Sequence, residues 1–211
     1  MKTDQEKRRV LDRLVAHYGR QDWWSSENFI QDWVSMILIQ QTTSANADRA
    51  LTNLAGKFDA QTLLNMPMEE LQELIRPAGF FKSKSQYIKN IMAFYLEHGG
   101  DLAAFENVAT EDLRKQLLAI KGIGEETADA SLLYVFKRKV FIADQYALRL
   151  FNRLGFGPYK TYRELRQDFM PLVEEKDVDL KLCQEWHAVI DVHGKHFRSQ
   201  KEMDESWLMV D

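Results

Sequence analysis

The sequence predicts an all-α protein. Apolar residues recur at the three- and four-residue spacing of amphipathic helices, glycine and proline interrupt these segments, and no stretch alternates apolar and polar residues as a strand would. No internal repeat or low-complexity tract stands out. A chain of 211 residues buries a substantial core, either in one large domain or in two small lobes.

The helices are expected in the following order. Residues 4–18 carry valines and leucines on one face and predict an amphipathic helix. From Phe29 to Gln40 the chain is apolar on nearly all sides, which predicts a centrally buried helix. A short helix starts at Pro67, because proline is tolerated in a first turn. Further helices are expected at about 45–57, up to His98, after Thr110, from Asp144 to Leu154, and at about 160–173 and 179–192.

Composition excludes several classes of protein. Hydrophobic residues make up 45% and charged residues 28% of the chain, as in ordinary soluble proteins. The apolar runs are too short to cross a bilayer and the charged N-terminus is unlike a signal peptide, so we expect a cytoplasmic protein. A net charge of −4 argues mildly against a nonspecific DNA coat, but a local basic face remains compatible with it. The single cysteine, Cys183, excludes an internal disulfide and a four-cysteine iron–sulfur site.

A tight connection, Lys121-Gly122-Ile123-Gly124, joins two apolar helical runs. Glycine at 122 and 124 allows backbone angles that a side chain would forbid. The glycines also leave amide groups bare at the start of the next helix, where oriented N–H donors bind phosphate whatever the base sequence. The hairpin is therefore a candidate anion site, and the alternative is an ordinary corner between two helices.

The whole pattern resembles the helix-hairpin-helix DNA glycosylase superfamily. That signature combines an apolar helix end, a glycine hairpin, a helix that opens with Thr-Ala, and an aspartate at the start of a later helix. Here these are Leu117 to Ile120, Gly122 to Gly124, Thr127-Ala128 and Asp144. The resemblance implies two helical lobes with the active site in the cleft between them. We expect one domain over 1–211, with a central lobe at about 27–135 and a second lobe formed by the N-terminal helix and about 136–211.

Asp144 is the candidate catalytic residue. Cleavage of an N-glycosidic bond passes through an oxocarbenium-like sugar, so a carboxylate beside the ring stabilises the developing positive charge and positions or activates water. The alternative role of Asp144 is that of a helix N-cap. The hairpin lies 22 residues upstream (144 minus 122) and would hold the phosphates while the aspartate faces the sugar. The two roles can coexist.

Two departures from the endonuclease III branch narrow the expected chemistry. Members that also cut the DNA backbone carry a lysine just before the Thr-Ala pair, which forms a Schiff base with the sugar, whereas this chain has Glu126. His193-Gly194-Lys195 is similar to the point where that branch leads into its cluster ligands, but Arg198 stands where the first cysteine would fall. The resemblance therefore implies a monofunctional hydrolase with no iron–sulfur cluster, no metal and no other cofactor.

The residues expected to line the base pocket are inferred from the branch that the chain resembles most, the cluster-free bacterial 3-methyladenine glycosylases. Those share a tryptophan pair before the buried helix, here Trp23-Trp24, and the hairpin over Lys121 to Ala130. Tryptophan faces bind cationic rings with ~0.5–2 kcal/mol each, which suits alkylated purines, although one of the pair can equally be core. The partner expected on the other side of the base is the small Ser44. The predicted pocket residues are Trp23, Trp24, Ser44 and Glu126.

The DNA contacts are also inferred from the resemblance. Gln41 would reach toward the space that a flipped base vacates, and the alternative is a solvent-facing helix end. Phe80, after Gly79, would wedge into the duplex at a cost of a few kcal/mol of unstacking, although a lone phenylalanine there is more often core. The predicted DNA-binding residues are Gln41, Phe80, Lys82, Lys84, Lys121, Gly122, Ile123, Gly124 and Thr127.

We therefore expect a base-excision-repair glycosylase that flips and releases alkylated, 3-methyladenine-type purines. Its expected partner is double-stranded DNA with a damaged base, and we expect a monomer without membrane association. One alternative is a glycosylase for a mismatched or oxidised base. Another is a noncatalytic helix-hairpin-helix DNA-binding protein, against which Asp144 argues, because phosphate binding needs no carboxylate near the strand.

Overall fold

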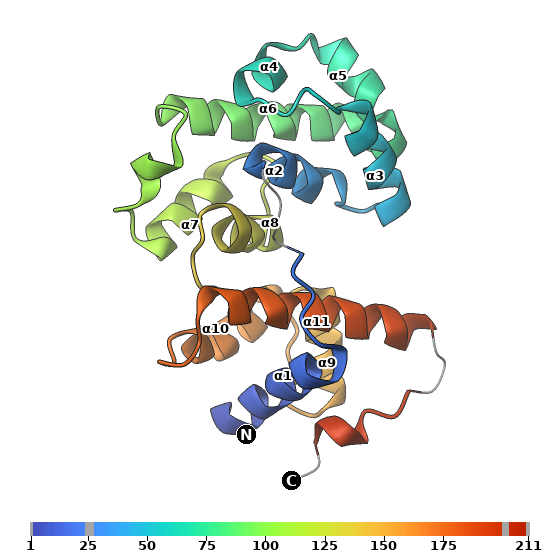
Figure 1. The fold of residues 1–211 in the computed structure, drawn as a ribbon, viewed down its shortest axis with the longest axis vertical. Coiled ribbons are helices and arrows are strands. Elements are labelled where there is room, and N and C mark those ends of the chain that lie inside the picture. The colour runs from blue at the N-terminus through green and yellow to red at the C-terminus, as the bar shows by residue number, and fades with distance from the viewer. Residues whose placement is uncertain (1, 24–27, 200–202, 210–211) are drawn as a thin grey trace. The chain divides into compact units, whose positions relative to one another are not determined.

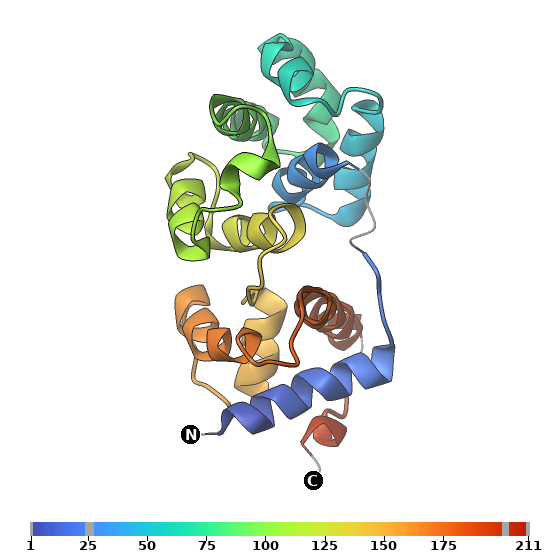
Figure 2. The same cartoon turned by 60° about the vertical axis from the view of Figure 1, so that its left-hand side comes forward.

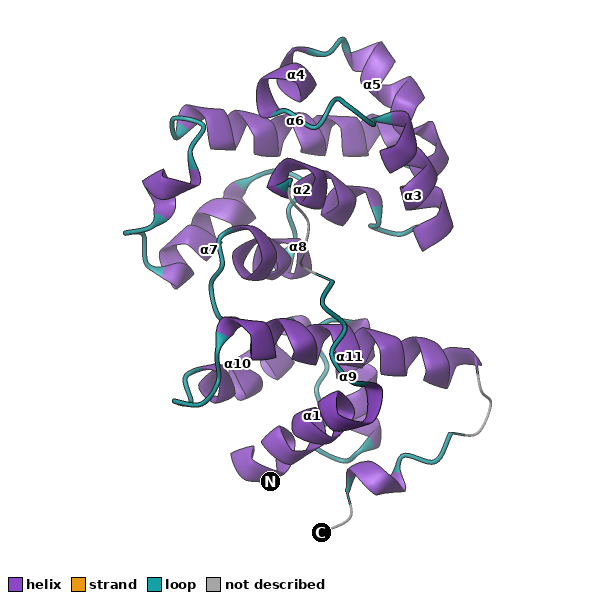
Figure 3. Cartoon of the chain, viewed as in Figure 1, coloured by secondary structure: helices purple, strands orange, loops and turns teal. Residues whose placement is uncertain are grey.

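The computed structural model describes residues 2–23, 28–199 and 203–209. In these ranges every regular element is a helix, so the all-α prediction is confirmed (Figures 1 and 3). The chain forms two compact units, one of residues 26–136 and one of residues 1–25 with 137–211. We call them the central unit and the terminal unit. No helix in the described ranges is both long and apolar enough to span a bilayer.

The central unit packs around two helices, α2 (Phe29–Leu38) and α6 (Phe81–Glu97). The predicted buried helix is α2, in which Trp33, Val34 and Ile37 are fully buried. The Trp33 indole donates to the Ser131 hydroxyl over 2.9 Å, which satisfies its buried N–H. The other elements are α3 (Ser44–Asn53), α4 (Ala60–Asn65), α5 (Met68–Ile75), η1 (Arg76–Ala78), η2 (Leu102–Phe105), α7 (Thr110–Ala119), α8 (Glu125–Ala130) and the π-helical turn η3 (Ser131–Val135).

A buried ion pair joins the two helices that flank the hairpin. Arg114 on α7 donates to Asp129 on α8 through Nε at 2.8 Å and Nη2 at 3.0 Å. Both side chains are buried. Loss of one partner would leave the other charge uncompensated, at a cost of about 3–5 kcal/mol. The pair thus fixes the angle at which α7 and α8 meet, and with it the shape of the hairpin.

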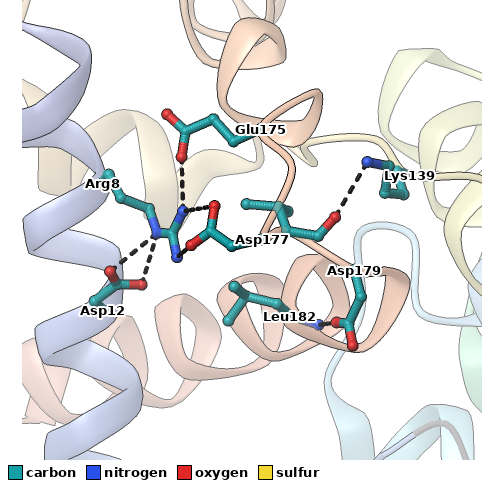
Figure 4. Close-up of polar contacts among 8 residues, drawn as sticks. Arg8, Asp12, Lys139, Glu175, Asp177, Asp179 and Leu182 are labelled. Atoms are coloured by element: carbon teal, nitrogen blue, oxygen red, sulfur yellow. Dashed lines mark hydrogen bonds and ion pairs between the residues drawn. The ribbon is translucent and has the colours of Figure 1, made fainter.

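The terminal unit consists of α1 (Asp4–Tyr18), α9 (Gln145–Arg153), α10 (Tyr162–Val173), α11 (Leu180–Ser199) and η4 (Ser206–Leu208) (Figure 2). A capping box at Thr3 and Glu6 starts α1. Arg8 on α1 binds Asp12, Glu175 and Asp177 at 2.6 to 2.9 Å, which fastens α1 to the connection between α10 and α11 (Figure 4). Nearby, the Lys139 amine donates to the main-chain oxygen of Val178 over 3.1 Å (Figure 4).

Helix α11 is longer than predicted. The sequence suggested an end near residue 192, before His193-Gly194, but the helix continues to Ser199. A Cβ at Gly194 would lie 2.2 Å from the Tyr146 ring, so glycine serves there to admit the neighbouring helix rather than to end its own. Helix α4 was not predicted, because its six residues are too few to show a period.

The C-terminal segment 203–209 folds back onto the terminal unit, where η4 contacts α1. His193 is fully buried between the Tyr18 hydroxyl at 2.9 Å from Nδ1 and Glu205 Oε1 at 2.8 Å from Nε2. Arg153 also donates to both oxygens of Glu205, at 2.9 and 2.6 Å. Burial alone would raise the pKa of Glu205, but the hydrogen bonds from Arg153 and His193 outweigh it and lower the pKa to about 2.

We predict that Glu205→Gln destabilises the protein by about 1–3 kcal/mol at pH 7, because it removes the charge that Arg153 and His193 bind. Since the folded pKa lies below the ordinary value of 4.5, this stability is present above that value and is lost as the pH falls toward 2. Thermal unfolding of both proteins from pH 7 to pH 3 checks the prediction. The difference in Tm should shrink with acidification, and a constant difference would contradict it.

Candidate functional site

The hairpin joins α7 to α8, and its two glycines have different roles. Gly122 has a φ of 100°, and a Cβ there would lie 2.1 Å from the Tyr87 ring on α6, so both backbone and packing require glycine. Gly124 has an ordinary φ of −87° with nothing within 4 Å of a Cβ. The backbone freedom that glycine allows is therefore used at 122 but not at 124. At Gly124 the missing side chain only leaves the start of α8 uncovered.

Two predicted DNA contacts in the hairpin point inward. Ile123 is 5% exposed and its amide closes the turn onto Ile120 O at 3.0 Å. The Thr127 side chain is buried and its hydroxyl accepts from Gln40 Nε2 at 3.0 Å. Their side chains thus shape the hairpin, and the Ile123 amide is already bonded within the turn. The exposed residues there are Lys121, Gly124 and Glu126.

The turn after α2 carries Gln41 outward. Gln41 is exposed and adopts a left-handed φ of 52°, which is uncommon for a residue other than glycine. Its neighbour Gln40 donates to Gly122 O at 3.3 Å as well as to Thr127, and so fastens this turn to the hairpin. Sequence inspection singled out Gln41 and passed over Gln40, because adjacent glutamines give no hint of which one faces inward.

A second exposed turn lies between η1 and α6. Phe80 has φ 45° and ψ 31°, and its side chain is 64% exposed. A bulky aromatic residue in the left-handed region costs of order 1–3 kcal/mol, which is typical of functional positions. Lys82 is exposed in the first turn of α6. Lys84, by contrast, is 2% exposed and its amine donates to Leu38 O and Ala78 O, so the prediction that it contacts DNA directly is wrong for this conformation.

Asp144 in the terminal unit is the N-cap of α9. Its Oδ1 accepts from the Ala147 amide at 2.7 Å, while Oδ2 lies 3.8 Å from His187 Nε2 on α11. Burial raises the pKa of Asp144 to about 6, and Asp191 adds to the rise, whereas the Ala147 amide opposes it. One oxygen therefore caps the helix. The carboxyl group as a whole loses its proton just below neutral pH.

His187 is a residue of this site that the sequence did not reveal. Burial lowers its pKa to about 4, although Asp191 opposes the fall, so its imidazole is neutral at neutral pH. Asp191 in turn pairs with Lys195 at 2.6 Å, one helical turn further along α11. Asp144 and His187 are separated by 43 positions in the sequence (187 minus 144). This is too far for a local spacing of residues to indicate that they form a pair.

The predicted base-pocket residues are divided between the units. Trp23, in the terminal unit, is 45% exposed, and the Lys195 amine lies 5.7 Å from its ring centroid. Trp24 falls outside the described residues. Ser44, the first residue of α3, and Glu126 are exposed in the central unit. Their convergence on one base stays a prediction. In the described part of the chain, no three His, Cys, Asp or Glu side chains are grouped to hold a metal ion.

Comparison with known proteins places this geometry in context. Residues 34–175 match the pattern of the family described as HhH-GPD superfamily base excision DNA repair protein. A Methanocaldococcus jannaschii protein provisionally named a DNA repair glycosylase is 38% identical over 205 residues, or 92% of this chain and 90% of that protein.

Two solved structures share the fold. The Helicobacter pylori 3-methyladenine DNA glycosylase bound to 1,N6-ethenoadenine superposes with a TM-score of 0.73 at 22% identity, over 95% of this chain and 98% of the other. An endonuclease III in a non-covalent complex with DNA superposes with a TM-score of 0.71 at 21% identity, over 88% of this chain and 85% of the other.

We predict that substitutions at the two hairpin glycines separate folding from binding. Gly122→Ala should lower the free energy of unfolding by more than about 1 kcal/mol, because of its positive φ and the contact with Tyr87. Gly124→Val should leave Tm nearly unchanged and weaken binding to every duplex alike, because a branched side chain would cover the amides at the start of α8. Tm and fluorescence anisotropy check both variants, and a loss of affinity restricted to lesion-containing DNA would contradict the assignment.

We also predict that Asp144→Asn stabilises the protein at pH 8. The folded pKa of about 6 lies above the ordinary 3.8, so ionisation of Asp144 costs stability as the pH rises through 6, by up to about 3 kcal/mol. Asparagine keeps the N-cap without the charge. The gain in Tm should therefore appear at pH 8 and vanish near pH 4. The control is Asp59→Asn at the exposed N-cap of α4, where no gain is expected.

Proposed function

The chain belongs to the HhH-GPD superfamily of base excision DNA repair proteins, and from this premise we propose that it is a monofunctional DNA glycosylase that releases alkylated purines from duplex DNA. The observation that carries the proposal is Asp144, a buried carboxylate whose pKa of about 6 leaves it charged at neutral pH. Phosphate binding needs no such buried charge, and an uncharged asparagine would cap α9 equally well.

The proposed reaction begins with base flipping. An enzyme reaches a glycosidic bond in a duplex only by turning the nucleotide out of the stack. Phe80 and Gln41, two exposed non-glycine residues of the central unit with left-handed backbones, support this step. Phe80 would enter between base pairs and Gln41 would occupy the vacated space, while the hairpin binds the backbone near Gly124. These roles follow the resemblance, and the strained backbone at both positions is an independent observation in their favour.

Bond cleavage would rely on Asp144. As the glycosidic bond breaks, positive charge grows on the sugar, and the Asp144 carboxylate stabilises it and orients water. A general base is most effective when its pKa lies near the operating pH, and the Asp144 pKa of about 6 meets this condition. Because only the ionised form can act, single-turnover base release should rise with pH through about 6 and then level off.

The preference for alkylated purines follows from the leaving group. A base alkylated at N3 or N7 departs neutral, whereas an unmodified purine departs as an anion unless an acid protonates it. His187 is the titratable group beside Asp144, but with a pKa of about 4 it holds no proton to donate at neutral pH. The exposed face of Trp23, which already lies near the Lys195 ammonium, is suited to a cationic ring.

The absence of strand cleavage is proposed from Glu126. A carboxylate cannot form the imine that strand-cutting members need, and Glu126 is exposed in the first turn of α8. We further propose that the protein works as a monomer without an iron–sulfur cluster, since Cys183 is its only cysteine. The runner-up function is that of a glycosylase for a mismatched or oxidised base, which would bind the DNA backbone in the same way.

Mass spectrometry of bases released from broadly damaged duplex DNA tests the proposal. We predict that 3-methyladenine-type purines appear much faster than mismatched or oxidised bases, and that Asp144→Asn keeps DNA binding while base release falls by about two orders of magnitude, equivalent to ~3 kcal/mol. Release of 8-oxoguanine or mismatched adenine, with none from methylated DNA, would move the assignment to the runner-up.

The same reactions test the monofunctional assignment. The strand should stay intact until alkali is added, and borohydride should trap no covalent adduct, because a trapped adduct requires an amine at the sugar. If an adduct forms, Lys121→Gln and Lys195→Gln identify which amine reacts.

A further inference from the structure

Lys84 is a buried lysine that the proposed reaction does not use directly. It lies in the first turns of α6, is 2% exposed, and its amine donates to Leu38 O at 2.7 Å and to Ala78 O at 2.9 Å. Burial lowers its pKa, because removal of the ammonium from water disfavours the charged form. A leucine would fill such a position at no electrostatic cost, so the amine must serve its two partners.

The two carbonyls belong to the two turns that the proposed function assigns to the duplex. Leu38 is the last residue of α2, three positions before Gln41, and Ala78 is the last residue of η1, two positions before Phe80. Both Gln41 and Phe80 then adopt the left-handed conformation. A single ammonium group thus lies between the main chains of both turns, and it neutralises carbonyls at helix ends, where the helix dipole concentrates negative charge.

The same face of α6 also holds the hairpin. Three residues after Lys84, the Tyr87 ring packs against the position where Gly122 lacks a side chain, and after three more residues Asn90 Nδ2 donates to Lys121 O at 3.0 Å. Residues three apart on a helix share one face. The two turns and the hairpin are therefore aligned by one stripe of α6.

We propose that Lys84 is a positioning residue for base extrusion, which sets the separation between the Phe80 wedge and Gln41 so that both enter the duplex together. This inference rests on the proposed function. The amine contributes to the reaction only through the two turns and not through contact with DNA. Its loss should therefore slow extrusion of the base while leaving binding to undamaged duplex nearly unchanged.

Helix α6 offers a matched control. Lys89 also bridges two carbonyls, Leu64 O at 2.6 Å and Met66 O at 2.5 Å, but these lie at the C-terminal end of α4, on a segment without Phe80 or Gln41. Lys84→Met and Lys89→Met each remove one amine that bridges two carbonyls, and both should lower Tm. Only Lys84→Met should reduce single-turnover base release, by about 10- to 100-fold, since a displacement of about 1 Å is enough for such a loss.

A double-mutant cycle separates positioning from general destabilisation. Extrusion is followed by the fluorescence of 2-aminopurine placed in the duplex, and release by single-turnover kinetics, both at a temperature where all variants are folded by circular dichroism. In the Phe80→Ala background Lys84→Met should cost much less than in the wild type, because the side chain that it positions is gone. Lys84→Gln, which keeps an N–H donor, is the second variant and should lie between Lys84→Met and the wild type.

The outcomes distinguish this inference from the function on which it rests. Equal losses from Lys84→Met in both backgrounds, or an equal loss from Lys89→Met, would overturn the positioning role while the wild type still releases bases. If the wild type releases no base from any damaged duplex, the proposed function fails.

Discussion

The central unit depends on one constraint, that carbonyl groups at the ends of its short helices need donors. A helix leaves its last carbonyls unbonded, and water cannot reach those that are buried. Side chains of α6, together with Gln40 just after α2, supply several such donors to helix ends and to the hairpin, and each of these bonds joins two elements. The donor residues are Lys84, Lys89, Asn90 and Gln40, and their acceptors are the main-chain oxygens of Leu38, Ala78, Leu64, Met66, Lys121 and Gly122.

Two carboxyl groups of the terminal unit, those of Asp144 and Glu205, have pKa values that move in opposite directions. Glu205 is bound by Arg153 and His193, which outweigh its burial and lower its pKa to about 2. At Asp144 burial, with Asp191 adding to it, outweighs the amides of Ala147 and Tyr146, and its pKa rises to about 6. The groups around a carboxylate, rather than its residue type, decide the direction in which its pKa moves. The carboxylate at which burial outweighs the favourable partners is the one suited to reaction, because its charge remains available to a developing cation.

The helices were largely predictable, because their apolar residues repeat with the helical period. Gly122 and Asp144 could be singled out by their place in a recognised pattern. The inward or outward direction of a side chain could not be predicted. Lys84 stands in a motif that suggested a surface contact. A lysine side chain is nevertheless long enough to reach through the core when buried carbonyls accept hydrogen bonds from its amine. His187 stayed hidden, since only tertiary packing brings α11 to Asp144.

The order of the segments has a consequence for biosynthesis. The central unit is one continuous stretch of chain, whereas the terminal unit combines α1 with helices that begin after residue 137. During translation α1 leaves the ribosome before the central unit, but the acidic partners of Arg8 at positions 175 and 177 are made 167 and 169 residues later. The apolar face of α1 therefore stays unpaired while the central unit completes its own contacts. When the last helices arrive, the folded central unit shortens the loop that α1 has to close, which reduces the entropic cost of joining the two ends.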